Sequence, residues 1–167
     1  SRGMKSPERE IVAALRALAV ETAKHGYAAI TPAAVSLPLE SLRLWVRAVS
    51  VARAEQGEDL QRGRARDEAI ILGANSEGPA ISHARKGAHD PSLIRLMTPE
   101  DEDILLAAAK TLPVLKVTIA PESVTPAQMR RLSDAGILLS IGHSDAGYDE
   151  CMTAAQNGVR CVTHLFN

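Results

Sequence analysis

Two kinds of hydrophobic segment alternate along the chain. Short segments rich in β-branched and other apolar residues, typical of buried strands, end in small or polar residues. They cover residues 27–35, 69–77, 115–121, 137–144 and 159–166. Longer segments have apolar residues at helical spacing and cover residues 7–25, 39–55, 99–110, 126–134 and 146–157. This alternation predicts an α/β fold with about five parallel strands and helices packed outside the sheet.

The predicted helix boundaries have suitable capping residues. A hydroxyl residue followed by proline begins three helices, because the hydroxyl accepts a bond from a free N–H and proline needs no acceptor. These pairs are Ser6–Pro7, Thr98–Pro99 and Thr125–Pro126. Glycines that suit a left-handed helix end follow four helices. They are Gly26, Gly57, Gly136 and Gly158. The charged stretch Glu58–Glu68 is expected to be an exposed loop.

The composition is that of a globular chain with an aliphatic core. Apolar residues make up 46% of the chain and aromatic residues only 2%. Nineteen basic residues oppose twenty acidic ones, so a net charge of −1 gives no electrostatic reason to expect nucleic acid or an anionic membrane as a partner. No apolar run approaches the roughly 18 residues that span a bilayer. Cys151 and Cys161 are too few for a disulfide framework, so a reduced cytoplasmic location is expected.

Three residues of metal-binding types follow three of the predicted strands. Glu77, His143 and His164 lie where strands run out into loops, and ligands bind at this edge of parallel α/β folds. Histidine nitrogen and carboxylate oxygen suit a divalent transition ion. Three protein ligands leave an open position, where a bound water has its pKa lowered towards about 7 and becomes a nucleophile. This pattern indicates a hydrolytic metal site.

A structural interpretation of the same residues stays open at this point. A histidine at a strand end is commonly a hydrogen-bonded structural residue. Separations as large as those between Glu77, His143 and His164 are not a metal motif in themselves, unlike HExxH.

Five motifs at these positions resemble one known family. They are Glu77-Gly78-Pro79, Lys86-Gly87-Ala88-His89, Thr118-Ile119-Ala120-Pro121-Glu122, Gly142-His143-Ser144 and Thr163-His164-Leu165-Phe166-Asn167. They occur in the same order and at similar spacing in the N-acetylglucosamine-6-phosphate deacetylases of the amidohydrolase superfamily. The resemblance covers essentially the whole chain.

The resemblance implies a (β/α)8 barrel with a small accessory β-sandwich, and hydrolysis of the N-acetyl amide of N-acetylglucosamine 6-phosphate to glucosamine 6-phosphate and acetate. By this resemblance Glu77, His143 and His164 hold a divalent metal, with zinc first and iron or cobalt as alternatives. His89 reaches the substrate and polarises the amide carbonyl. Asn167 helps to hold the sugar phosphate. A homodimer is common in the family.

The sequence departs from the family pattern in two ways. Asn75 stands where the family usually has histidine, and Ala80 where it usually has a bulky residue, which leaves a deacylase of another N-acylated substrate as an alternative. The family's first strand with its His-x-His, its general-base Asp, its last strands and the sandwich are not found. Residues 1–167 are therefore expected to be a partial barrel, from the first helix to the sixth strand. A truncated, non-catalytic barrel remnant is the second alternative, and activity of this segment alone is in doubt.

Overall fold

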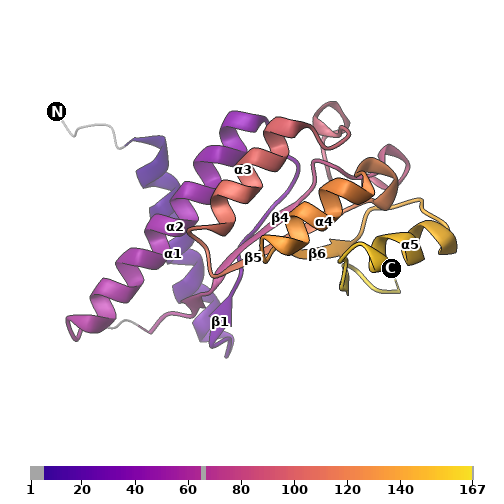
Figure 1. Ribbon diagram of the computed structural model, residues 1–167. Coiled ribbons are helices and arrows are strands. Elements are labelled where there is room, and N and C mark those ends of the chain that lie inside the picture. Colours follow the sequence, from indigo (N-terminus) through magenta and orange to yellow (C-terminus); the bar gives the residue numbers. More distant parts are fainter. Residues whose placement is uncertain (1–5, 65–66, 167) are drawn as a thin grey trace.

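The computed structural model describes residues 6–64 and 67–166 (Figure 1). The helices are α1 (Pro7–Lys24), α2 (Leu39–Gln61), α3 (Pro99–Ala109), α4 (Pro126–Asp134) and α5 (Tyr148–Gln156). The strands are β1 (Ala29–Ile30), β2 (Ala33–Ala34), β3 (Ile70–Ile71), β4 (Gly73–Glu77), β5 (Val114–Ile119), β6 (Leu138–Ile141) and β7 (Cys161–Val162). Within the described ranges no helix has both the length and the apolarity needed to cross a membrane.

Five strands form one parallel sheet, as the sequence predicts, and their order is β2-β4-β5-β6-β7. A second parallel pair, β1 with β3, continues the β2–β4 pair. The predicted strand 27–35 is divided into β1 and β2 around Pro32, which has no N–H to donate to a ladder. The carbonyl of Pro32 still accepts a bond from the N–H of Asn75, which connects the β1–β3 pair to the β2–β4 pair. Both pairs are parallel.

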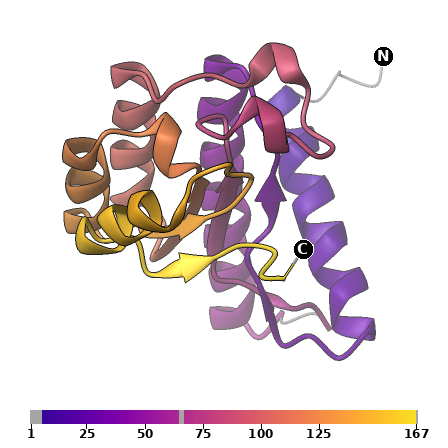
Figure 2. The same ribbon diagram turned by 90° about the vertical axis from the view of Figure 1, so that its right-hand side faces the viewer.

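The helices lie along one side of the sheet, each packed against the next in chain order (Figures 1 and 2). Alternate residues of β5, among them Leu115, Val117 and Ile119, face the helices and belong to the aliphatic core. The opposite face is polar at the same level, because Glu77, Thr118 and Ser140 are register partners on neighbouring strands. One face of the sheet therefore supports the fold, and the other is available for chemistry.

The predicted caps form where expected. The hydroxyl oxygens of Ser6, Thr98 and Thr125 accept bonds from backbone N–H groups three residues later, at 3.4, 3.2 and 3.3 Å. Three of the four predicted helix-end glycines have positive φ, as expected of a left-handed C-cap. They are Gly26, Gly136 and Gly158.

The prediction for the end of the second helix is wrong. Helix α2 runs through Gly57 and ends at Gln61, so part of the expected loop 58–68 is helical. Two contacts from outside α2 explain the longer helix. Asp59 binds Arg16 of α1 at 3.0 Å, and the Gln56 amide bonds the backbone of Ala69 and Ile71 at 2.8 and 2.9 Å.

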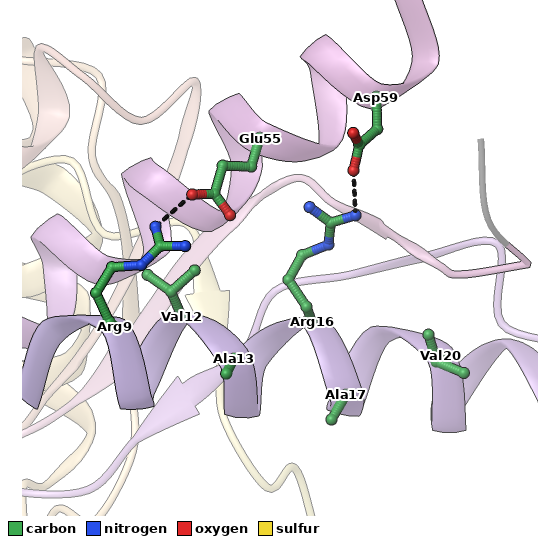
Figure 3. Close-up of a pocket in the computed structure, with 8 residues that line it drawn as sticks. All are labelled: Arg9, Val12, Ala13, Arg16, Ala17, Val20, Glu55 and Asp59. Carbon is green, nitrogen blue, oxygen red and sulfur yellow. Dashed lines mark hydrogen bonds and ion pairs between the residues drawn. The ribbon is translucent and has the colours of Figure 1, made fainter. Parts of the chain in front are cut away.

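Arg16 joins α1 to α2 and to the start of the sheet. Its guanidinium donates two bonds to Glu68, at 2.7 and 2.9 Å. A third bond goes to Asp59, as Figure 3 shows. The side chains of Arg16 and Glu68 are only 10% and 6% exposed, so the pair is shielded from water. Figure 3 also shows Arg9 bound to Glu55 in the same groove, but these side chains are 51% and 35% exposed.

We predict that Glu68→Gln lowers the free energy of unfolding by about 2–3 kcal/mol, because it leaves the shielded Arg16 cation undercompensated. Urea denaturation followed by circular dichroism measures the loss. The control is Glu55→Gln, which removes the exposed partner of Arg9 and is expected to cost under about 1 kcal/mol. Equal losses in the two variants would contradict a special role of the Arg16 ion pair.

Candidate metal centre

The carboxyl ends of the strands bring one carboxylate and three imidazoles together. Glu77 is the last residue of β4, while His143 and His164 each lie two residues beyond the end of a strand, β6 and β7. The Nε2 atoms of His164 and His143 lie 3.1 and 3.8 Å from Glu77 Oε1. His89 comes from the long segment between β4 and α3, and its Nε2 lies 3.9 Å from Glu77 Oε2. The predicted side chains therefore meet, except for Asn167, which lies outside the described residues.

A metal ion fits the donor atoms of this cluster. Ligand atoms of Glu77, His89 and His143 lie within 4.8 Å of one another, and His164 approaches the same carboxylate. The His143 Nδ1 lies 2.8 Å from the carbonyl oxygen of Arg85, which can only accept, so Nδ1 carries the proton. Its Nε2 is buried and has no hydrogen-bond partner among the described residues. In the neutral ring that nitrogen presents a lone pair to the site, as a metal ligand requires.

His89 differs from His143 in burial and in partners. The residue is only 3% exposed, and its Nδ1 lies 3.0 Å from the backbone nitrogen of Ser36, which donates to it. Burial, together with the neighbouring His143 imidazole, lowers the pKa of His89, and the Glu77 carboxylate offsets only part of that effect. The neutral form of His89 is therefore favoured.

A layer of hydroxyl groups lies between the strands close to the cluster. Thr163 Oγ1 lies 2.9 Å from Thr118 Oγ1 and 2.7 Å from Ser140 Oγ, which links β5, β6 and the segment after β7. Gly142 allows this approach, because a Cβ there would lie 2.7 Å from the Thr118 methyl and 2.8 Å from the Thr163 Cβ. The layer fixes the backbone immediately before His143 and His164.

The segment that carries His89 is anchored to α3 by an ion pair between Arg95 and a buried carboxylate. Arg95 donates to both carboxylate oxygens of Asp101, at 2.6 and 3.1 Å, and Asp101 is fully buried. Neither this pair nor Ser36 is predicted from the sequence. For Ser36 a signal existed, since it follows the predicted strand 27–35 and so lies at the same edge of the sheet as the other site residues.

An open cleft of about 500 Å³ adjoins the cluster. It is lined by Arg85, Gly87, His143, Ser144, Thr163 and His164. A volume of this size accommodates a small polar molecule such as a monosaccharide derivative. Arg85 places a positive charge at the rim of the cleft, and its guanidinium forms an ion pair with Asp145 at 2.8 Å.

Glu122 holds the loop that follows His143. Its two carboxylate oxygens accept bonds from the Asp145 N–H at 2.7 Å and from the Ser144 hydroxyl at 2.8 Å. The Glu122 side chain thus ties the loop after β6 to the loop after β5. Its role in this structure is to position the loop rather than to face the cluster.

We predict that Glu122→Ala speeds hydrogen exchange of the Asp145 amide about tenfold, because the amide loses a charge-assisted acceptor. Exchange measured by NMR on the 167-residue chain gives the rate. Glu150→Ala serves as the matched control, since Glu150 accepts instead from the nearby Gly147 N–H. Unchanged exchange at Asp145 in the Glu122 variant would show that the loop is held by other contacts.

Comparison with curated proteins finds amino-sugar-phosphate deacetylases. The N-acetylgalactosamine-6-phosphate deacetylase of Shewanella sp. (strain ANA-3) is 40% identical over 97 residues, which are 58% of this chain and 24% of that protein. The N-acetylglucosamine-6-phosphate deacetylase of Danio rerio is 32% identical over 146 residues, which are 86% of this chain and 34% of that protein. The chain therefore spans about a quarter to a third of the length of these relatives. No protein-family model matches the chain.

Comparison of structures agrees. A Mycobacterium smegmatis N-acetyl-D-glucosamine-6-phosphate deacetylase mutant, in complex with N-acetyl-D-glucosamine-6-phosphate, superposes with a TM-score of 0.70 at 33% identity. The match covers 94% of this chain and 39% of that one. The parallel sheet with its helices is thus part of a (β/α) barrel, as predicted. By sequence and by structure, the chain is similar to N-acetylglucosamine-6-phosphate deacetylases over about a third of their length.

Proposed function

We propose that the chain provides the metal-binding part of a deacetylase that hydrolyses the N-acetyl amide of N-acetylglucosamine 6-phosphate. The observation that carries the proposal is the buried, unpartnered Nε2 of His143, which faces the Glu77 carboxylate at 3.8 Å. A buried nitrogen lone pair without a partner is costly unless it binds a proton donor or a metal ion. The similarity to named deacetylases makes a metal ion the interpretation of choice.

In this proposal Glu77, His143 and His164 hold the ion, and His89 does not. The Arg85 carbonyl fixes the His143 proton on Nδ1, which frees Nε2. His164 presents its Nε2 at 3.1 Å from Glu77 from the exposed side of the cluster. A divalent cation bound there supplies Lewis-acid polarisation of the acyl carbonyl and an activated water near neutral pH.

His89 is proposed to donate a hydrogen bond to the acyl oxygen. Resonance makes an amide a poor electrophile, and negative charge develops on that oxygen during attack. Buried donors stabilise such charge by a few kcal/mol in comparable sites. His89 is neutral and buried, and its Nε2 faces the cluster, so it suits this task. Asn167 is proposed to contact the sugar phosphate, as the resemblance implies.

N-acetylgalactosamine 6-phosphate is the second candidate substrate, because the Shewanella relative is named for it at 40% identity. Asn75 lies on β4 two residues before Glu77, and its Oδ1 is buried without a partner among the described residues. An unpartnered acceptor on the strand that bears Glu77 can receive a substrate hydroxyl. Ala80 is fully buried and supplies no bulky side chain. We propose that the side chains at positions 75 and 80 determine which N-acyl substrate the site prefers.

We further propose zinc as the ion, with iron or cobalt as alternatives, since nitrogen and oxygen ligands suit all three. A cytoplasmic location is supported by Cys151 and Cys161, which are both free thiols. A homodimer and a span from the first barrel helix to the sixth strand are carried over from the family. The zinc ion, the cytoplasmic location, the homodimer and this span are all proposed for the whole protein.

We predict that Glu77→Gln weakens zinc binding more than about a hundredfold, because loss even of groups that only support a ligand costs 10–100-fold. Isothermal titration of the chain with zinc measures the affinity. The control is Glu122→Gln, which changes a carboxylate that binds the neighbouring loop instead. Unchanged zinc affinity in the Glu77 variant would remove the proposed site.

We predict that His89→Ala lowers acetate release about 10²–10³-fold and leaves bound zinc unchanged, because it removes an oxyanion donor and no ligand. Turnover and metal content are measured on the protein that carries this sequence. His25→Ala is the control, since His25 is exposed beside the end of α1. If His89→Ala empties the metal site, then the residue is a ligand and the assigned role is wrong.

Acetate release from a panel of N-acyl sugars tests the function itself. The zinc-loaded protein is offered N-acetylglucosamine and N-acetylgalactosamine, each with and without the 6-phosphate. The proposal expects the highest kcat/KM for N-acetylglucosamine 6-phosphate. Preference for an unphosphorylated or a different N-acyl compound would favour the alternative function, a deacylase of another N-acylated substrate. Zinc binding without turnover on any member would favour the non-catalytic remnant.

A further inference from the structure

Ser36 contacts His89 with two groups at once. It lies two residues after β2 and is only 2% exposed. Its backbone N–H donates to His89 Nδ1 at 3.0 Å, and its hydroxyl oxygen lies 2.9 Å from the same nitrogen. Both partners therefore approach the ring nitrogen that points away from Glu77.

These contacts determine where the neutral imidazole carries its proton. A backbone N–H can only donate, so Nδ1 must present a lone pair to it. The single proton of neutral His89 then lies on Nε2, the atom 3.9 Å from Glu77. With Nδ1 unprotonated, the Ser36 hydroxyl is free to donate to it as well, which favours the same tautomer.

Neutral His143 has the opposite tautomer, because its Nδ1 faces an acceptor instead of a donor. Its Nδ1 lies 2.8 Å from the Arg85 carbonyl oxygen, an acceptor, so its proton lies on Nδ1 and Nε2 has a free lone pair. The two rings are neighbours, with centroids 4.6 Å apart. Partners on the far side of each ring thus make one imidazole a hydrogen-bond donor towards the cluster and the other a ligand.

Gly78 fixes the position of Ser36. A Cβ on Gly78 would lie 2.3 Å from the Ser36 hydroxyl oxygen, so that oxygen lies directly against the Gly78 backbone. Gly78 follows Glu77 in the chain and has φ +81°, a conformation that favours glycine. Ser36 is therefore held between the residue after Glu77 and His89.

We propose that Ser36 is a positioning residue that holds His89 in the Nε2–H tautomer, which keeps His89 out of the metal ligand set and directs its proton towards the substrate acyl oxygen. The tautomer itself follows from the contacts of Ser36. Its use in catalysis rests on the proposed function.

Nitrogen NMR of the ¹⁵N-labelled, metal-free chain tests the tautomer at a pH where the histidines are neutral. We expect His89 to have a protonated Nε2 and an unprotonated Nδ1, with a preference above about tenfold, because the other tautomer sets two N–H groups against each other. His143 is the internal control, with a protonated Nδ1 expected in the same spectrum. A protonated Nδ1 at His89 would overturn the proposal.

Two variants test the contribution of the Ser36 side chain. Any residue except proline supplies the backbone N–H, so the claim for serine concerns the hydroxyl. Ser36→Ala is expected to move a measurable fraction of His89 to the Nδ1–H tautomer, and Ser36→Thr is expected to restore the wild-type signals. A His89 spectrum in Ser36→Ala identical to that of the wild type would overturn the role of this residue.

Zinc titration of the same labelled sample separates this inference from the proposed function. Added zinc is expected to shift the His143 Nε2 signal and to leave the His89 Nε2–H signal in place. Loss of the His89 Nε2–H signal would make His89 a ligand and overturn the inference. Because the tautomer is measured without metal or substrate, a failure of zinc binding or acetate release would refute the proposed function alone.

Discussion

The parallel register of β4, β5 and β6 is the constraint on which the site depends. It aligns Glu77 with Thr118 and Ser140, so that all three side chains stand on the polar face of the sheet at one level. Parallel strands end at a common edge, and the loops that follow β6 and β7 therefore deliver His143 and His164 to the same carboxylate. A shift of one residue in this register would turn Glu77 towards the helices.

The same sheet separates stability from chemistry. Apolar residues of β5 and β6 face the helices and pack with them in the aliphatic core, in which Trp45 is the one aromatic residue among those that the structure describes. The polar face carries the hydroxyl layer and the cluster around Glu77, whose carboxylate is 14% exposed. Ion pairs outside the cluster, such as those of Arg16 and Arg95, fix helices and loops without entering it.

Local pattern was sufficient to predict the elements and the strand-end residues, and contacts between distant residues account for what it missed. Helix α4 has the predicted bounds, 126–134, because its cap and apolar spacing lie within the segment itself. The extension of α2 depends on Arg16, 43 residues before Asp59. The proton position on His89 depends on Ser36, 53 residues away. The Arg16–Asp59 contact has no signature in the neighbouring sequence, and for Ser36 the sequence indicates only a place at the strand-end edge and not the contact with His89. Glu77, His143 and His164 could be placed because parallel strands share an edge.

The backbone conformations of His143 and His164 affect how these positions tolerate change. Both have positive φ, 50° and 54°, in a region that asparagine, aspartate and histidine enter more readily than other side chains. A β-branched or bulky replacement would strain the loop as well as remove an imidazole, and the two effects would be inseparable. Asparagine preserves the local backbone preference while withdrawing the ring nitrogen. During divergence of related sequences, the loops after β6 and β7 can therefore lose an imidazole through asparagine and still keep their shape.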